Sequence, residues 1–397
     1  MNGPARPRRA PYGASVRVVV LGAGFGGLEL TTLLSDRFGE RLDLVLIDQA
    51  EGFVFGFSKL DVMFGRTTAD QVVHRYDDVL KPGVQFVRTT VRSIDPTSKT
   101  VVTDAGTYAA DVLVVALGAD LDPAATPGLV EGGHEFYTVE GAFATRAVLE
   151  AFPGGHVVVG VTSTPFKCPP APSETALLVH DLLEQRGLLE RSQVSLLMPL
   201  PVPIPPSPDA SKVLLETFSQ RGIHWHASTV VRGLDPERRV VLLRDADGVE
   251  TELAYDLFLG VPKHRAPDVV IEAGLTEDGW IPVDYTLQTR FPGVFAVGDC
   301  TSVGTPKAGV FAEGQATIAA DRITALLRGE VPEAVYDGRG ICYLEVGHGE
   351  IAKVDVMFAS GASPRGSLQG PSPELAADKA AFGTERIQRW FGRIWSA

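Results

Sequence analysis

The chain has 397 residues and a formal net charge of −13, with 45% apolar and 21% charged residues. This length exceeds what one compact core accommodates, so we expect at least two domains of a soluble globular protein. The negative charge and the lack of a basic stripe argue against nucleic acid as a partner. Three cysteines are too few for a disulfide scaffold and indicate a reducing compartment, the cytoplasm. The apolar runs fall short of the roughly 20 residues that span a bilayer.

The first third of the chain has the pattern of a parallel sheet with crossing helices. Residues 1–13 are interpreted as a flexible arm, and Val16–Leu21 as a strand that is buried on both faces because it is almost wholly apolar. A helix follows in which large apolar residues repeat every four positions, with Gly39 as its C-terminal cap. Four later segments are predicted strands: Leu42–Ile47, Val84–Thr89, Val101–Thr103 and Asp111–Ala116.

The alternation of strands and helices starts again after a glycine-rich, acidic segment at 128–133, which we interpret as the boundary of a second domain. The predicted elements are strand His156–Val161, helix Ser173–Gln185, strand Val194–Met198, a proline-rich extended loop at 199–208, helix Ala210–Gln220 and strand Ile223–His226. Strand Val294–Val297 returns the chain to the first domain, and a helix at 311–327 packs on it. The predicted units are 14–128 with 257–330, then 129–256, and a C-terminal interface segment at 331–397.

A dinucleotide fingerprint lies between the first predicted strand and helix. The segment Gly22-Ala23-Gly24-Phe25-Gly26-Gly27 fits G-x-G-x-x-G, and Asp48 follows the next strand. In this motif Gly22 makes the tight turn and Gly24 admits a pyrophosphate at the helix N-terminus. Gly27 lets helix and strand approach, and the acid can accept a hydrogen bond from a ribose. The motif has all its parts in order, so we predict a dinucleotide site.

A second, distant segment indicates which dinucleotide binds. Residues 289–299, Thr-Arg-Phe-Pro-Gly-Val-Phe-Ala-Val-Gly-Asp, resemble the second FAD motif of the pyridine nucleotide-disulfide flavoproteins, and Leu113–Gly118 resembles their middle motif with Leu117 in place of Thr. The resemblance covers about residues 15–360. It implies an α/β fold of two Rossmann-like three-layer domains, as in glutathione reductase, and FAD contacts from Gly118, Gly298 and Asp299.

The second domain lacks the signature of a nicotinamide site. Its first strand is followed by Thr162–Cys168 rather than by a glycine motif, and its second strand runs into Pro199 without an acid. Instead, Cys168-Pro-Pro-Ala-Pro-Ser-Glu174 resembles a segment of flavocytochrome c sulfide dehydrogenase flavoproteins and, more loosely, of sulfide:quinone oxidoreductases, with Ser173 where Tyr is usual. The segment around Cys342 resembles their second cysteine. The resemblance therefore implies a redox-active disulfide between Cys168 and Cys342 above the flavin.

The resemblance also implies a mechanism. Hydrosulfide would attack the disulfide, leaving a persulfide and a thiolate, and two electrons would pass to the flavin. Glu174 is a candidate base, although an acid in a first helical turn more often serves the helix dipole. Lys307 precedes a helix expected to point at the flavin, where it would stabilise the reduced ring. Cys300 is interpreted as structural, and His264 and Arg265 as interdomain contacts or parts of the active-site surroundings.

The electron acceptor depends on the C-terminal segment 385–397. One helical face carries Ile387, Trp390, Phe391, Ile394 and Trp395, and the opposite face Arg386, Arg389 and Arg393. This pattern suits peripheral contact with the cytoplasmic face of a membrane, as a quinone reductase requires, or docking on the protein or on a homodimer partner.

The function that we predict is oxidation of sulfide, or of a small thiol or persulfide, with electrons passing through FAD to a quinone. The flavocytochromes that the chain resembles have a covalent flavin link, but residues 49–60 contain no cysteine that could form it, so the FAD is expected to be non-covalent. The alternatives are an NAD(P)H-dependent reductase of quinones or disulfides, and a non-catalytic flavin-binding interaction protein. No metal site is predicted.

Overall fold

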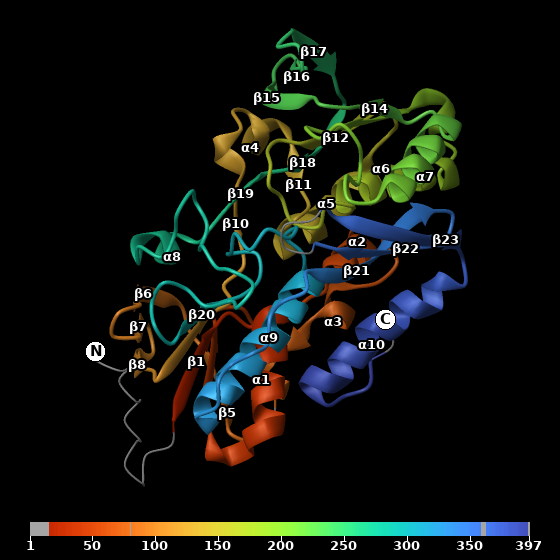
Figure 1. Ribbon diagram of the computed structural model, residues 1–397. Coiled ribbons are helices and arrows are strands. Elements are labelled where there is room, and N and C mark those ends of the chain that lie inside the picture. Colours follow the sequence, from red (N-terminus) through yellow and green to blue (C-terminus); the bar gives the residue numbers. More distant parts are fainter. Residues whose placement is uncertain (1–15, 80, 359–362, 396–397) are drawn as a thin grey trace.

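The computed structural model describes residues 16–79, 81–358 and 363–395, so the predicted arm at 1–13 lies outside the described residues (Figure 1). The first domain is built on a five-stranded parallel sheet in the order β20-β9-β1-β2-β5. These strands are β1 (Arg17–Leu21), β2 (Asp43–Asp48), β5 (Val84–Arg88), β9 (Val112–Val115) and β20 (Val294–Ala296). The predicted order of strands along the chain is confirmed, with ends that differ by one or two residues.

Two layers cover this sheet. On one face lie helices α1 (Phe25–Phe38) and α9 (Gly309–Arg328), which pack against each other. On the other lie the antiparallel strands β6 (Val91–Asp95), β7 (Thr100–Thr103) and β8 (Gly106–Ala109), with the short helix α8 (Asp268–Glu272). Alternate residues of β1 therefore enter two separate cores: Val18 and Val20 face α1, whereas Val19 and Leu21 face β7. This explains why β1 is apolar at both registers.

The second domain repeats this plan. Its parallel sheet has the order β11-β18-β12-β13-β14. The strands are β11 (His134–Glu135), β12 (His156–Val161), β13 (Gln193–Leu197), β14 (His224–His226) and β18 (Leu257–Val261). Helices α5 (Val139–Ala151), α6 (Ala171–Gln185) and α7 (Pro208–Gln220) belong to one layer, and the antiparallel strands β15 (Val230–Asp235), β16 (Val240–Arg244) and β17 (Glu250–Ala254) to the other. The expected pair of Rossmann-like three-layer domains is confirmed.

Short elements join the domains. The strands β10 (Asp120–Asp122) and β19 (Lys263–Arg265) pair antiparallel where the chain leaves the first domain and returns to it. The remaining short elements are β3 (Gly52–Phe53), β4 (His74–Arg75), α2 (Gly56–Met63), α3 (Ala69–Val72) and α4 (Leu129–Gly132). The proline-rich loop ends sooner than expected, because Pro208 occupies the first turn of α7 behind the capping residue Ser207.

The C-terminal residues form a third unit, made of the antiparallel strands β21 (Arg339–Gly347), β22 (Glu350–Met357) and β23 (Arg365–Ser372) and helix α10 (Leu375–Phe391). Strand β21 contacts both α6 and α9, and α10 packs on α1 (Figure 1). The unit thus contacts both larger domains.

The structure decides between the two interpretations of the C-terminal helix in favour of docking on the protein. Ile387 and Trp390 are fully buried, and Phe391 is nearly so. The basic residues pair with acids of the first domain: Arg386 with Glu313, Arg389 with Glu29 and Arg393 with Asp78. Ile387, Trp390 and Phe391 therefore cannot insert into a membrane in this structure, because the protein itself covers these side chains. Ile394, which is 87% exposed, stays outside the core.

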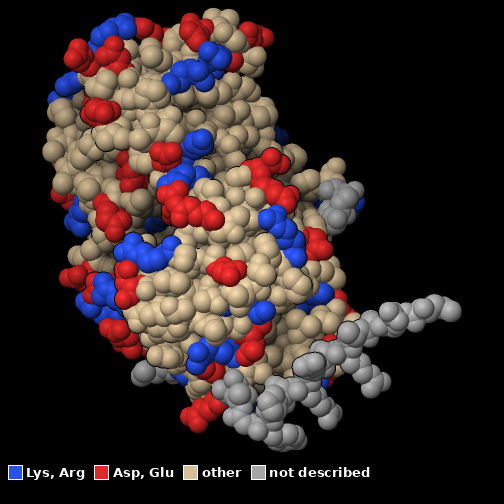
Figure 2. Space-filling model, turned by 90° about the vertical axis from the view of Figure 1, so that its left-hand side faces the viewer, with Lys and Arg blue, Asp and Glu red and all other residues tan. Residues whose placement is uncertain are grey.

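Charged side chains on the surface are mixed in sign. On the face that Figure 2 shows, Lys and Arg alternate with Asp and Glu and form no continuous basic stripe among the described residues. No helix among the described residues is long and apolar enough to cross a membrane.

Candidate active site

The glycine loop between β1 and α1 has the geometry that its sequence predicts. Gly22 has φ +97°, and a Cβ there would lie 2.3 Å from the carbonyl oxygen of Ala116. A Cβ on Gly27 would lie 1.8 Å from the carbonyl oxygen of Gly22, so α1 can approach β1 only with glycine at this position. Gly24 differs, because no atom lies within 4 Å of a Cβ built there. Gly22 and Gly27 therefore serve the fold, and Gly24 leaves its space to a ligand.

Asp48 lies at the carboxyl end of β2, beside this loop. Its carboxylate accepts hydrogen bonds from the backbone N–H groups of Ala23, at 2.7 Å, and Ala50, at 2.8 Å. Burial raises the pKa of Asp48, and these backbone donors oppose that rise. The carboxylate thus stands where the fingerprint requires its acid, and its contact with Ala23 also fixes the glycine loop.

A cavity of about 330 Å³ opens between the glycine loop, the second domain and the C-terminal unit. Its walls combine residues from predicted motifs that are far apart in the sequence. The glycine loop provides Gly24 and Gly26, the two FAD segments provide Gly118, Gly298 and Asp299, and residues 308–310 at the start of α9 complete that side. Gly118 and Gly298 both have positive φ, which lets their backbones turn at the cavity wall. Five of the predicted cofactor residues thus line one cavity, whereas Gly22, Gly27, Asp48 and Lys307 are not among its lining residues.

Cys168 and Cys342 line the same cavity. Cys168 lies in the loop before α6, with φ +52°, and its N–H donates to the carbonyl of Lys307 at 2.7 Å. Cys342 lies on β21 of the C-terminal unit. Both are partly buried free thiols in the structure. Burial raises the pKa of the Cys168 thiol and raises the pKa of Cys342 to about 12, so the uncharged forms of sulfur, thiol or disulfide, are favoured in this site.

The carboxylate of Glu174 contacts the C-terminal unit instead of capping its own helix. The residue lies in the first turn of α6, but its carboxylate accepts a hydrogen bond from the N–H of Glu345 on β21, at 2.9 Å, and makes no cap for its own helix. It is buried, lines the cavity and contributes to the raised pKa values of both cysteines. Burial raises the pKa of Glu174 to about 7. Glu174 therefore stands in the first turn, as the dipole interpretation requires, and can also exchange a proton near neutral pH.

Behind Glu174 lies a buried ion network. Glu345 pairs with Arg66 and with Lys379. Although burial alone would raise the pKa of Glu345, Lys379 and Arg66 lower it to about 2. This carboxylate is therefore fixed in its charged form, which leaves Glu174 as the neighbouring acid that can change its charge.

Three lysines of the cavity were not found from the sequence: Lys59 on α2, Lys167 in the loop before Cys168, and Lys379 on α10. Lys59 donates to the carbonyl of Tyr137, and burial lowers its pKa to about 7, with Lys167 adding to the shift. The segment around Lys59 mixes apolar and polar residues, so it offered no signal that would single out this lysine. The lysines make the cavity attractive to anions.

Lys307 is not among the residues that line the cavity, and its contact with a flavin ring stays a prediction. Its ammonium donates to the carbonyls of Asp299, at 2.6 Å, and Thr301, at 3.0 Å, and lies 3.3 Å from the centre of the Trp280 ring. Burial lowers the pKa of Lys307 to about 8. Lys307 is a positioning residue that holds the turn carrying Asp299, while the backbone at the start of α9 faces the cavity.

Cys300, His264 and Arg265 are not among the residues that line the cavity. The thiol of Cys300 is fully buried and donates to the carbonyl of Val297 at 3.3 Å. His264 is buried between the domains, where its Nδ1 lies 2.9 Å from the carbonyl oxygen of Pro262 and its ring packs on Tyr137. Arg265 pairs with Asp268 next to it.

The loop after β12 does not form a second glycine cradle. It crosses to the first domain, where Lys167 and Lys307 form an isolated parallel bridge. The side chain of Phe166 is buried in the main core. The segment after β12, where a nicotinamide fingerprint would stand, thus places Cys168 next to the first domain.

The fold and this cavity define a class of protein, the oxidoreductases with two dinucleotide-binding domains. The family model "Pyridine nucleotide-disulphide oxidoreductase" matches residues 16–320. The chain belongs to this family, and the motifs described above are the ones in which its sequence resembles the family.

Individual relatives and one solved structure agree with this assignment. Over 347 residues the chain is 26% identical to the mitochondrial sulfide:quinone oxidoreductase of Mus musculus, covering 84% of this chain and 76% of that protein. Over 323 residues it is 27% identical to the alternative NAD(P)H-ubiquinone oxidoreductase C1 of Arabidopsis thaliana, covering 72% of this chain and 62% of that protein. The crystal structure of the sulfide:quinone oxidoreductase from Aquifex aeolicus superposes with a TM-score of 0.83 at 22% identity, covering 95% of this chain and 92% of that one.

The protein is an FAD-dependent oxidoreductase, and the cavity fits this cofactor. Gly24 leaves open space at the N-terminus of α1, where a pyrophosphate is stabilised by backbone N–H groups. Asp48 provides a carboxylate at the glycine loop, and Asp299 provides one in the second FAD segment. The start of α9 presents a second helix N-terminus to the cavity. When bound, FAD accepts two electrons from a donor and passes them on.

Proposed function

We propose that this chain oxidises sulfide, or a small thiol or persulfide, through Cys168 and Cys342 and delivers the electrons through FAD to a quinone. The single observation that carries the proposal is that Cys168 and Cys342 both line the cavity formed by the FAD motifs. The relatives named sulfide:quinone oxidoreductases support the substrate and the acceptor.

The proposed reaction starts from the disulfide. Hydrosulfide breaks the Cys168–Cys342 bond, forms a persulfide on one cysteine and releases the other as a thiolate. A small thiol then takes the sulfane sulfur as its own persulfide and returns its proton to the first cysteine. The thiol and thiolate re-form the disulfide, releasing one proton and two electrons.

The surrounding charges suit this sequence. The cavity lysines attract the hydrosulfide anion and stabilise a thiolate that burial would otherwise disfavour. Glu174, whose pKa is about 7, holds the proton that the closing step releases. The ammonium of Lys379 pairs with Glu345 and also lines the cavity, so α10 contributes to the site as well as to the interface.

A quinone is a membrane lipid, so the proposal includes peripheral contact with the cytoplasmic face of a membrane. With Ile387, Trp390 and Phe391 of α10 buried, Ile394 is the large apolar side chain that is exposed among the described residues 385–395. Homodimer formation is a further proposal for this C-terminal unit.

The test is an anaerobic titration of the FAD-loaded protein with sulfide, watched at the flavin absorption band with and without a short-chain quinone. Sulfide should bleach the band, and quinone should restore it. Cys168→Ser and Cys342→Ser should keep FAD and lose bleaching by sulfide. Cys300→Ala, which removes the buried structural thiol, is the matched control and should bleach like the parent protein.

The same titration separates the alternatives. Bleaching by NADH but not by sulfide would contradict the proposal in favour of a nicotinamide-dependent reductase, the activity in the name of the Arabidopsis thaliana relative. If neither donor bleaches the flavin, the proposal fails and a non-catalytic flavin-binding protein remains.

A further inference from the structure

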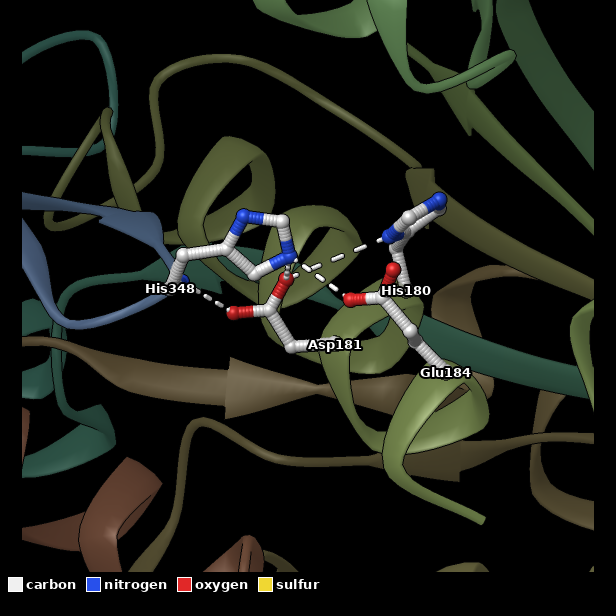
Figure 3. A group of neighbouring side chains, drawn as sticks. All are labelled: His180, Asp181, Glu184 and His348. Carbon is white, nitrogen blue, oxygen red and sulfur yellow. Dashed lines mark hydrogen bonds and ion pairs between the residues drawn. The ribbon is translucent and has the colours of Figure 1, made fainter. Parts of the chain in front are cut away.

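We propose that His180, Asp181, Glu184 and His348 form a binding site for one divalent transition-metal ion, with zinc as the best match. The site lies outside the cavity, at the junction of α6 with the turn that joins β21 to β22 (Figure 3). It is independent of the proposed function. The sequence did not predict it, because His348 is 164 residues from Glu184.

The four side chains converge from two segments. His180 and Glu184 are one helical turn apart on α6, Asp181 is next to His180, and His348 approaches from the turn (Figure 3). One potential ligand atom from each residue lies within 4.8 Å of the other three. The Nε2 of His348 is 2.8 Å from Oε2 of Glu184 and 3.3 Å from Oδ1 of Asp181.

The 2.8 Å contact is a hydrogen bond in the structure, which a bound ion would replace, and the 3.3 Å separation is that of two ligands in a coordination shell. Zinc bound tetrahedrally by imidazole and carboxylate at roughly 2.0 to 2.2 Å holds its ligand atoms about 3.3 Å apart. The distance from Nδ1 of His180 to Oδ1 of Asp181 is 3.9 Å, so small side-chain rotations would close the shell. Two imidazoles and two carboxylates make a four-ligand set that suits zinc better than magnesium or calcium, which prefer oxygen.

The buried imidazole of His180 is the second observation that points to a ligand. Its residue is only 8% exposed, and its Nδ1 has no hydrogen-bond partner. This nitrogen faces Asp181 at a separation too long for a hydrogen bond (Figure 3). A buried polar nitrogen without a partner costs free energy, and a metal ion between the two groups would satisfy it.

The charge balance also favours a cation. Two carboxylates face the site, and one basic residue offsets them, because Arg221 donates to Oδ1 of Asp181 at 2.7 Å. The backbone N–H of His348 donates to the other oxygen, Oδ2. With neutral imidazoles the cluster therefore keeps a net negative charge, and Arg221 and this N–H orient Asp181 as outer partners orient ligands in known metal sites.

Metal binding would join the two segments that carry the cysteines. Helix α6 begins three residues after Cys168, and β21 carries Cys342. An ion held between α6 and the turn after β21 would therefore restrict their relative motion. Because the ligand set is not assembled in the unfolded chain, binding also stabilises the fold, and at a hundredfold excess over Kd the apparent Tm should rise by about 3 °C.

The test is a zinc titration of the metal-free, FAD-loaded protein by isothermal calorimetry, with bound metal counted after dialysis. We expect one equivalent, and at least a tenfold weaker Kd in His348→Ala and in Glu184→Gln. Both residues are about half exposed, so these changes should leave folding intact. His224→Ala removes an exposed imidazole elsewhere and is the matched control, which should bind like the parent protein.

Two results would overturn the proposal. One is the absence of stoichiometric binding, or binding that His348→Ala and Glu184→Gln leave unchanged. The other is binding that disappears in Cys168→Ser with Cys342→Ser, which would place the ion in the cavity. With cobalt as the probe, the parent protein should show visible bands of a tetrahedral ion, and His348→Ala should lose them.

Discussion

Replacing the buried acid Glu174 by glutamine should make the stability of the protein less dependent on pH. The pKa of Glu174 is raised from 4.5 in water to about 7, so the folded chain holds a proton there that the unfolded chain releases. The stability that this proton contributes is full below about pH 4.5 and is lost as the pH rises to about 7. A difference of about 2.5 pKa units corresponds to about 3 kcal/mol. The amide of the Glu174→Gln variant has no proton to lose in this range, so the variant avoids this loss.

The comparison is a Tm measurement of Glu174→Gln and the parent protein at about pH 5 and about pH 8. For a chain of this length about 3 kcal/mol corresponds to about 4 °C, so the variant should gain about 4 °C over the parent at the higher pH and under about 1 °C at the lower. Other titrating groups are common to both proteins and cancel. Glu216→Gln removes an exposed carboxyl on α7 and should show equal differences at both pH values. An equal or larger gain for Glu174→Gln at about pH 5 would refute the reasoning.

Three further predictions concern the cofactor site and the C-terminal helix. Gly27→Ala places a Cβ 1.8 Å from a backbone oxygen and should lower the free energy of unfolding by more than about 3 kcal/mol, seen as loss of folded protein. Gly24→Ala should keep the Tm of the FAD-free chain and weaken FAD binding at least tenfold, as measured by flavin fluorescence. Lys307→Met should lower FAD retention while the retained flavin still bleaches with sulfide; loss of bleaching would return Lys307 to the reacting site. Arg389→Ala leaves the buried carboxylate of Glu29 without its cation and should lower stability by about 2 kcal/mol in denaturant unfolding; an unchanged midpoint would contradict this.

The features that the sequence predicted well depend on local sterics. A Cβ on Gly27 would collide with Gly22 of the same strand–turn–helix unit, and a Cβ on Gly22 would collide with Ala116 at the end of the neighbouring strand β9, so backbone approach fixes both glycines. The parallel strands are equally local in origin, since a strand buried on both faces must be apolar at every position, as in β1 and β12. The two FAD segments were recognised by their resemblance to motifs of the pyridine nucleotide-disulfide flavoproteins.

The sequence was weaker where several segments meet. It placed Glu174 correctly in a first helical turn but could not show that β21 passes within hydrogen-bond reach of it. It missed Lys59, because the direction of a long side chain depends on what surrounds it rather than on its position in the chain. The apolar face of α10 was visible, but its partner was not, since burial against α1 and burial in a membrane require the same pattern.

By itself, the sequence determined two dinucleotide-type domains, the glycine loop and two cysteines in recognisable segments. Only the tertiary structure decided that Cys168 and Cys342, 174 residues apart, line one cavity and that His348 meets α6. The physical reason is that backbone sterics and periodic burial act over a few residues and leave a local trace. Electrostatic and coordinating contacts form wherever folding brings side chains together. The sequence separation of the residues that make them follows no pattern, so these contacts cannot be recognised in the sequence.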